Sequence, residues 1–380
     1  MQTRKNRFDR MEWSGAFGDI GTLFPFLAGF ILVAGFEATG ILWMFGVSMI
    51  IAGMVFKTPI AVQPMKVIGG AVIAQGASMT SGTIFAAGFF LGVLWLFLAS
   101  TNLLTYIEKL VTKPIVYGIM LALGIRFMTN GIAMMAEQWY IAVPVLVVMF
   151  LLLQNTKIPA MFFLLFVGVA IGFYNDSTMI GQIFNFRQIA FHLPSVEMRP
   201  FSWYELLAGA VTLGIPQASM SISNALLATA EEHNRLAPER KVTVKQLAIM
   251  QGIKNVIAPF IGGIPLCYGV GGMVGQMRFG ARTGGAPIIM GALLVVTALF
   301  FQQPFMLLLQ VFPVYVIGVA LFITGLELAV SMKKMTITTD HLYILILTAG
   351  FAMWNMGAGL LAGVLLQQMS SKRWVIFEKH

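Results

Sequence analysis

Charged residues are scarce in this 380-residue sequence, where Asp, Glu, Lys and Arg together make up 10%. A water-soluble domain carries about 25% of such residues, because its surface must be hydrated. The chain therefore has too little charge to cover a soluble globule. Cysteine is scarcer still, with Cys267 alone, which excludes an internal disulfide framework and a cysteine-rich metal site.

Catalytic signatures are also missing. The sequence has no H-E-x-x-H, G-x-S-x-G or P-loop motif, the marks of zinc peptidases, serine hydrolases and nucleotide-binding proteins. Gly269-Val270-Gly271 resembles part of a dinucleotide loop, but no strand is expected before it. The four histidines are scattered. We therefore expect no metal and no cofactor, and an intramembrane enzyme is kept only as an alternative class.

Apolar residues dominate instead, at 58% of the chain with a mean hydropathy of +0.85. They form runs of about 15–25 residues, the length at which a helix crosses a bilayer. The sequence predicts an all-α polytopic membrane protein with about fourteen transmembrane segments. These segments are expected near 14–35, 38–56, 64–76, 82–104, 114–129, 139–153, 158–174, 203–229, 244–262, 266–278, 284–301, 304–330, 341–354 and 355–369. The third and the tenth are too short to span and are expected to be half-helices.

The basic residues, which give a net charge of +9, indicate the orientation. Of the 24 Lys and Arg, only Arg187 and Arg199 fall in loops on the far side from the N-terminus, while Lys66, Arg126 and Lys254 fall within segments. The positive-inside rule then predicts that both termini are cytoplasmic. We expect a multi-pass protein of the inner or plasma membrane, with the lipid bilayer and no nucleic acid as partner.

A polar stretch near 174–202 divides the chain. We expect a first repeat over 1–175, an external connector over 176–202 and a second repeat over 203–380, without a soluble regulatory domain. An odd number of segments in each repeat, about seven, makes the second repeat inverted. Segments broken by glycine and proline occur in both halves, at 18–25 and 213–219, and each precedes one of the short segments. Such pairs mark the binding site of a transporter.

The short segments also predict an anion site, because a helix N-terminus presents free N–H groups and a positive dipole end. Pro64 suits the first helical turn, which needs no N–H, and Pro265 suits the same position in the other half. Lys66 is the most informative charge. It opposes the helix dipole and lies near the membrane midplane, so it needs an anionic partner. That partner is either Asp19 or the substrate, and both interpretations stay open.

Asp19 is an intramembrane carboxylate, which serves either as a proton-coupling group or as a structural hydrogen-bond acceptor. Uncharged donors gather at the four breaks, although helix packing would also explain them. Arg126 and Lys254 are set aside, because a cation near a segment end snorkels to the interface. The residues predicted to bind substrate are Thr22, Gln63, Pro64, Met65, Lys66, Gln217, Ser219, Tyr268 and Gly269.

Three motifs carry a family resemblance: Gly18-Asp19-Ile20-Gly21-Thr22, Val62-Gln63-Pro64-Met65-Lys66 and Gly280-Ala281-Arg282-Thr283-Gly284-Gly285. Together they resemble the molybdate transporter family, a branch of the sulfate permease superfamily, over nearly the whole chain. The resemblance implies a seven-plus-seven inverted repeat with core and gate domains. It also implies an oxyanion held between the N-termini of the third and tenth helices. Position 268 differs from the family pattern, because this sequence has tyrosine where the family is expected to have histidine.

The function expected from this resemblance is secondary transport, as a symporter, of a tetrahedral oxyanion. Molybdate is the first candidate and tungstate or sulfate the next. A carrier of another small anion or of a nucleobase on the same fold is the alternative. A homodimer is the assembly to be tested.

Overall fold

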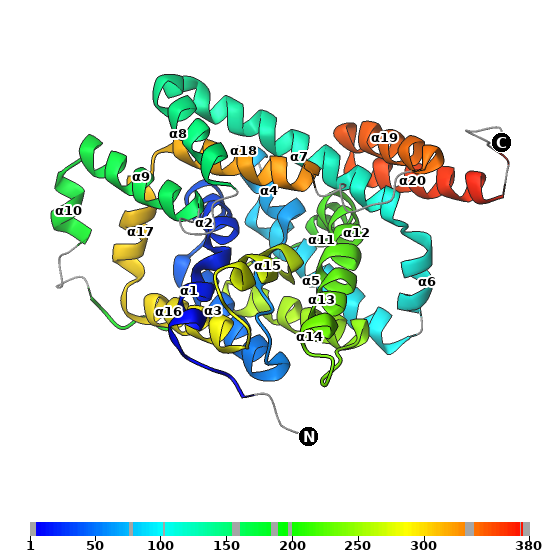
Figure 1. Cartoon of the computed structure of the whole chain (residues 1–380), viewed down its shortest axis with the longest axis horizontal. Helices are drawn as coiled ribbons and strands as arrows, with labels where there is room; N and C mark the ends of the chain where they lie inside the picture. Colours follow the sequence, from blue (N-terminus) through cyan, green and yellow to red (C-terminus); the bar gives the residue numbers. More distant parts are fainter. Residues whose placement is uncertain are drawn as a thin grey trace.

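The computed structural model is a helical protein with one two-stranded ribbon (Figure 1). The structure describes residues 5–75, 79–101, 103–153, 160–183, 189–196, 200–330, 338–372 and 374. In the first half the helices are α1 (Arg10–Ala16), α2 (Ile20–Ala28), α3 (Ala38–Phe56), α4 (Lys66–Gln75), α5 (Ser81–Ser100), α6 (Leu103–Leu110), α7 (Lys113–Met135), α8 (Trp139–Leu152), α9 (Ala160–Asn175) and α10 (Thr178–Ile183). The 3₁₀ helices η1 (Phe17–Asp19) and η4 (Ala136–Gln138) and the π-helix η2 (Gly29–Val33) extend or join them.

In the second half the helices are α11 (Trp203–Gly209), α12 (Ile215–Met220), α13 (Ala228–Leu236), α14 (Val244–Ile257), α15 (Val270–Arg278), α16 (Gly285–Phe300), α17 (Gln302–Val311), α18 (Val314–Val330), α19 (Thr339–Trp354) and α20 (Met356–Ser371). The π-helices η6 (Ala210–Gly214) and η7 (Ser221–Leu227) and the 3₁₀ helix η8 (Ala258–Ile261) interrupt this half. The strands are β1 (Val62–Pro64) and β2 (Leu266–Tyr268).

Several helices begin where the sequence places a side-chain cap. The Thr80 hydroxyl accepts a hydrogen bond from the Thr83 N–H before α5, and Ser202 and Glu205 form a capping box on α11. Asn355 separates α19 from α20, and its side chain accepts from the N–H of Ala358. These caps satisfy N–H groups that have no partner within the helix.

Three helical stretches of the described residues are long and apolar enough to cross a membrane: Ala38–Phe56, Ser81–Ser100 and Lys113–Leu152. The number rises to six when each of three sharply bent pairs is counted as one span. The sequence predicts about fourteen segments, which is more than the number of spans found by length and composition. The two numbers differ because many helices here are short or broken. The predicted segment 304–330, for example, is wrong as one helix. It divides into α17 and α18 at Pro313, whose ring disfavours helical geometry in the residue before it.

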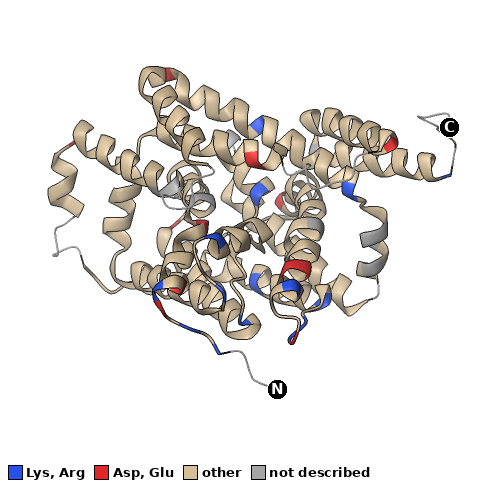
Figure 2. Cartoon of the chain, in the orientation of Figure 1, with Lys and Arg blue, Asp and Glu red and all other residues tan. Residues whose placement is uncertain are grey.

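The helices form two groups with short elements between them. Helices α7, α8, α18, α19 and α20 lie along one side of the molecule, and α1, α3, α14 and α16 along the other (Figure 1). Helix α7 packs on α18 and α19, while α3 packs on α16 and α5 on α14. Charged residues are sparse over both groups (Figure 2). Helices α4 and α15 lie between the groups.

Glycine allows the closest crossings. A Cβ on Gly46 of α3 would lie 2.6 Å from the carbonyl oxygen of Gly291 on α16. A Cβ on Gly291 would lie equally close, at 2.5 Å, to the carbonyl oxygen of Gly46. The two backbones therefore touch directly, as small residues permit in membrane helices.

The ribbon is the part of the fold that the sequence did not predict. Strands β1 and β2 pair antiparallel, with Val62 opposite Tyr268 and Gln63 opposite Cys267. Pro64 therefore lies in a strand and not in a helical turn, and α4 begins two residues later at Lys66. A strand also does precede Gly269, against expectation, but it pairs antiparallel and belongs to no dinucleotide-binding unit. Strands of three residues are too short to show a sequence period.

Candidate functional site

The β1–β2 ribbon joins the starts of the two short helices α4 and α15. Backbone bonds extend the ribbon beyond its strands, since the Met65 N–H donates to the Pro265 carbonyl at 3.1 Å. The Gly269 N–H likewise donates to the Ala61 carbonyl at 3.2 Å. Because the strands are antiparallel, α4 and α15 leave the ribbon at opposite ends and in opposite directions. The positive ends of both helix dipoles therefore lie at the ribbon.

Asp19 and Gln63 form a buried pair against α15. The Gln63 Nε2 donates to the Asp19 Oδ1 at 2.6 Å, and both side chains are buried. Gly272, in the first turn of α15, lies so close that a Cβ there would clash with the Asp19 carboxylate and the Gln63 amide. The broken first segment and the ribbon thus meet at the start of α15.

Gln217 reaches the start of α4 from the other broken segment. Its Oε1 accepts from the Val67 N–H at 2.8 Å, and its Nε2 donates to the Ser221 hydroxyl at 3.0 Å. The Val67 N–H belongs to the first turn of α4, where no intrahelical partner exists, so Gln217 acts as a cap. Ser219 has no bond to α4 in the described part of the chain, and its hydroxyl donates instead to the Pro216 carbonyl.

Lys66 is the first residue of α4, and its side chain is buried. Met65 before it has no exposed surface. Among the predicted residues the structure therefore gathers Asp19, Gln63, Lys66 and Gln217 around the ribbon and the start of α4. Thr22 lies in α2, but its side chain is outside the described residues.

Tyr268 and Gly269 complete the other end of the ribbon. Gly269 precedes α15 with extended backbone, and its Cα lies against the side-chain amide of Gln63. Tyr268 is buried and packs edge-on against Phe56, with ring centroids 5.8 Å apart. The Lys254 Nζ lies 3.6 Å from the centroid of the Tyr268 ring, a cation–π contact.

The prediction that Lys254 snorkels to the interface is wrong. Its side chain is buried and its ammonium has no hydrogen-bond partner among the described residues. The neighbouring Asn255 was also missed: its Nδ2 donates to the Leu266 carbonyl at 2.7 Å, and its Oδ1 accepts from the Leu266 N–H at 2.8 Å. Asn255 therefore supports β2 through both of its side-chain polar atoms. The sequence signal for it is a pair of polar residues, Lys254 and Asn255, in an apolar segment next to a Pro/Gly break.

Glu327 of α18 is another candidate residue, and the sequence motifs do not include it. Its carboxylate experiences the charges of Lys66 and Arg278. A carboxyl group within an apolar membrane helix is a functional candidate, because burying it there costs free energy. It adds an acidic side chain, from α18, to the surroundings of Lys66.

The Gly280–Gly285 motif has a structural role. The Glu12 Oε1 accepts from the N–H groups of Arg282 and Thr283, each at 2.9 Å, and its Oε2 accepts from the Ala286 N–H at 3.0 Å. Arg7 donates its N–H to the Thr283 hydroxyl. The motif therefore ties the N-terminal segment to the start of α16, where a carboxylate is favourable.

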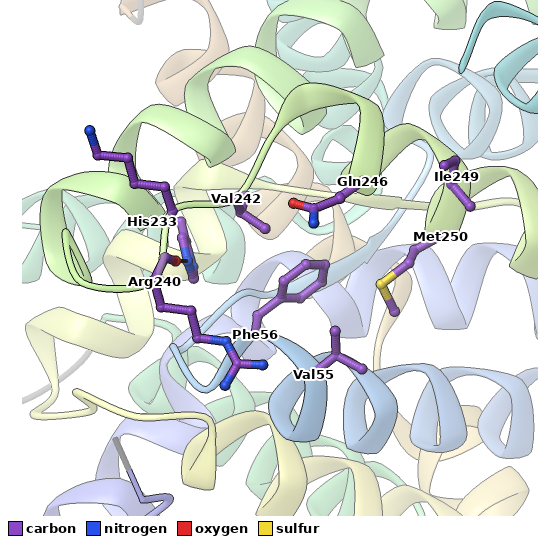
Figure 3. Close-up of a pocket in the computed structure, with 9 residues that line it drawn as sticks. Val55, Phe56, His233, Arg240, Val242, Gln246, Ile249 and Met250 are labelled. Atoms are coloured by element: carbon purple, nitrogen blue, oxygen red, sulfur yellow. Dashed lines mark hydrogen bonds between the residues drawn. The ribbon is translucent and has the colours of Figure 1, made fainter. Parts of the chain in front are cut away.

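A cavity of about 240 Å³ lies between α3, α13 and α14, lined by Phe56, His233 and Arg240 among others (Figure 3). Its wall is fixed by His233, whose Nε2 donates to the Arg240 carbonyl at 2.8 Å. A carbonyl only accepts, so the Nδ1 is left to bond the Thr58 hydroxyl at 2.7 Å. Phe56 contacts both this histidine and Tyr268, and so links the cavity to the ribbon.

Comparisons with known proteins identify the family of this chain. The profile of the family described as "Molybdate transporter of MFS superfamily" matches residues 11–127 and 209–328. Molybdate transporter 2 of Arabidopsis thaliana is 25% identical over 410 residues, which cover 94% of this chain and 87% of that protein. Molybdate transporter 1 of Chlamydomonas reinhardtii is 22% identical, over 93% of this chain and 90% of that one.

Solved structures give the fold. The transmembrane domain of the cyanobacterial bicarbonate transporter BicA superposes with a TM-score of 0.65 at 17% identity, over 96% of this chain and 99% of that one. Murine SLC26A9, an anion transporter in the inward-facing state, gives 0.66 at 12% identity, over all of this chain and 70% of that one. The chain is an integral multi-pass membrane protein with this fold, and it belongs to the molybdate transporter family, a family of transporters and not of enzymes.

Proposed function

We propose that the protein carries a tetrahedral oxyanion, molybdate first, across the membrane by alternating access. The anion is held at the ribbon, between the first turns of α4 and α15. The observation that carries this proposal is that two short helices leave one buried ribbon in opposite directions, with Lys66 as the first residue of one of them. Two positive dipole ends and one ammonium favour an anion there.

The predicted residues take different parts in this proposal. Lys66 supplies charge, and the backbone around Pro64, Met65 and Gly269 supplies close approach and N–H groups. Gln63 and Gln217 hold the geometry through their bonds to Asp19 and Val67. Thr22, Ser219 and Tyr268 are proposed as uncharged contacts.

Asp19 gives a route to proton coupling. A carboxylate beside an anion site repels the substrate when it is ionised and ceases to do so when it binds a proton. We propose that a proton on Asp19 accompanies the oxyanion, which would make the protein a symporter. Gln63 then links the two events, because its side chain contacts both Asp19 and Gly269.

A seven-plus-seven inverted repeat, with 1–175 and 203–380 as repeats around the 176–202 connector, is part of the proposal. In this scheme α3 corresponds to α14, and α5 to α16. Helix α3 packs on α16 and α14 packs on α5, so each contact maps onto the other. The pairs α7–α18 and β1–β2 map onto themselves. These contacts are the ones that a two-fold relation requires, and they support the scheme.

The orientation proposed from the charges places both termini inside and the connector outside. It is tested with Arg235→Cys and Leu193→Cys in intact cells. A membrane-impermeant thiol reagent is expected to label position 193 and spare position 235.

The proposed function is tested by binding of molybdate, tungstate and sulfate to the purified protein, side by side, followed by uptake into proteoliposomes. Molybdate is expected to bind tightest and to be taken up in a saturable manner. Saturable uptake of a nucleobase or a monovalent anion, without binding of any of the three oxyanions, would favour the alternative carrier. The mass of the detergent-solubilised protein decides whether it is a homodimer.

A further inference from the structure

A second cavity, larger than the one in Figure 3, lies apart from the ribbon and along α4. Its volume is about 720 Å³. On one side it is lined by residues of α4, α5 and α11, and on the other by residues of α7 and the α19–α20 break. Helices α7, α19 and α20 belong to the first group of helices, and α5 packs on α14 of the second, so the cavity lies between the two groups. Of the described residues that line it, Arg126 is the one cation and none is an anion.

One hydrogen bond holds the Arg126 side chain in place and leaves most of its donors available. Its Nη2 donates to the Met353 carbonyl at 2.8 Å, at the end of α19. A guanidinium has five N–H donors in a planar fork, so this single bond orients the group and leaves capacity for a ligand. The side chain is half-buried, and water therefore screens its charge only in part.

Asn130 provides a second donor on the same face of α7. It lies four residues after Arg126, one helical turn along, and both residues line the cavity. The Asn130 Nδ2 is buried and has no hydrogen-bond partner among the described residues. A buried amide without a partner costs free energy, and an oxyanion in the cavity would accept its hydrogen bond.

The cavity borders the first two turns of α4, the helix that begins at the ribbon site. Val67, Gly70 and Ala71 line it, and this spacing forms one face of α4 directly after Lys66. Tyr204, which follows the connector proposed to be external, also lines the cavity, from α11. Glu205 is the next residue, and its carboxylate already accepts bonds from Thr80 and Ser202.

We propose that this cavity is a second oxyanion site, on the external side, where Arg126 and Asn130 hold a tetrahedral dianion before it reaches the start of α4. The proposal rests on the proposed function and extends it. The site concentrates the anion where the two groups of helices meet, next to the helix that binds it during transport.

Uptake kinetics give the first test. Arg126→Gln is expected to raise the KM for external molybdate about tenfold or more and to leave kcat nearly unchanged, because a charge-assisted contact is lost. Arg126→Lys keeps the charge and should keep most of the affinity, and Asn130→Asp should raise KM because it adds a negative charge. Arg240→Gln is the matched control, since it removes one exposed cation from the smaller cavity. An unchanged KM in Arg126→Gln, or an equal rise in Arg240→Gln, would overturn the proposal.

Thiol labelling gives a second test that does not depend on transport. Thr212 lines the cavity and is exposed, while Cys267 is buried, so Thr212→Cys reports on the cavity. The measured quantity is the ratio of two labelling rates, that of a negatively charged methanethiosulfonate with a sulfonate group over that of a positively charged one with a trimethylammonium group. This ratio should be higher at Thr212→Cys than at Leu193→Cys. Adding Arg126→Gln should reduce this preference roughly fivefold, as expected for the loss of one unit charge nearby.

Molybdate should protect Thr212→Cys from labelling, and Arg126→Gln should abolish that protection. Equal labelling preference with and without Arg126, and protection that survives its loss, would refute the second site. A protein that shows the labelling preference but takes up no molybdate would refute the proposed function and leave the anion site standing.

Discussion

The Nε2 of Gln63 donates a hydrogen bond of 2.6 Å to the Oδ1 of Asp19, inside the protein and against the first turn of α15. The bond joins the strand that leads into α4 to the break in the first helical segment. An amide–carboxylate bond of this length is charge-assisted and strong. Movement or protonation of Asp19 is therefore expected to reach the ribbon from which both short helices start.

Asp19→Asn separates the charge of Asp19 from its structural bond. Asparagine also offers an oxygen to the Gln63 amide, so the protein should fold and purify normally. If Asp19 carries the coupling proton, uptake driven by a pH gradient should be abolished while molybdate exchange continues. Proteoliposomes with and without an imposed pH gradient measure both activities. Normal pH-driven uptake by the variant would remove Asp19 from the coupling mechanism.

Gly272→Ala tests the contact between α15 and the Asp19–Gln63 pair. A Cβ at this position would lie 2.5 Å from the Gln63 Nε2, so the pair must shift, at a cost of about 1–3 kcal/mol. Molybdate affinity should fall together with thermal stability.

Gly271→Ala is the matched control for this change, because a Cβ there meets nothing within 4 Å. Within a helix it should be neutral or stabilise the protein by about 0.4–1 kcal/mol. Equal melting temperatures for the two alanine variants would contradict the close contact.

Glu12→Ala is expected to destabilise the protein by about 3 kcal/mol or more. The change leaves the N–H groups of Arg282, Thr283 and Ala286 without their acceptor. The bonds of Thr283 and Ala286 are buried, and each buried group left without a partner costs about 1–3 kcal/mol. Any variant protein that remains folded should bind molybdate normally, because Glu12 lies at the start of α16 and not at the ribbon. Thermal unfolding and binding on the same preparation measure the two effects, and Glu137→Ala, at an exposed carboxylate, is the control. A loss of affinity without a loss of stability would give the motif a binding role.

The sequence predicted the membrane class, the two short helices and most of the residues around them, because charge, hydropathy and Gly/Pro breaks are local features. Lys66 and Asp19 stand out in apolar segments for the same reason. The ribbon was not predictable, since three-residue strands leave no period and their pairing joins residues about two hundred positions apart. Lys254 was misjudged because its distance from a segment end says nothing about which face of the helix is buried.

The pairing of Gln217 with the Val67 N–H shows the same limit. The sequence marked Gln217 as a donor near a break, but the structure uses its oxygen as a helix cap. Which atom of a side chain is used depends on tertiary packing, and no local pattern records it. The role of the Gly280–Gly285 motif was hidden for a similar reason, because its partner Glu12 lies in the N-terminal segment.

The ammonium of Lys66 is proposed to hold the oxyanion at the ribbon. The most direct test of this role is molybdate affinity and thermal stability of purified Lys66→Ala, of the same change combined with Asp19→Asn, and of Lys245→Ala as an exposed control. A lost charge-assisted contact is worth about 1.5–3 kcal/mol, so both Lys66 variants should bind molybdate roughly ten- to a hundredfold more weakly. If Lys66→Ala loses stability because it leaves the charge of Asp19 unpaired, the double variant should recover that stability. It should not recover molybdate affinity. Wild-type affinity in a stable Lys66→Ala protein would contradict the account.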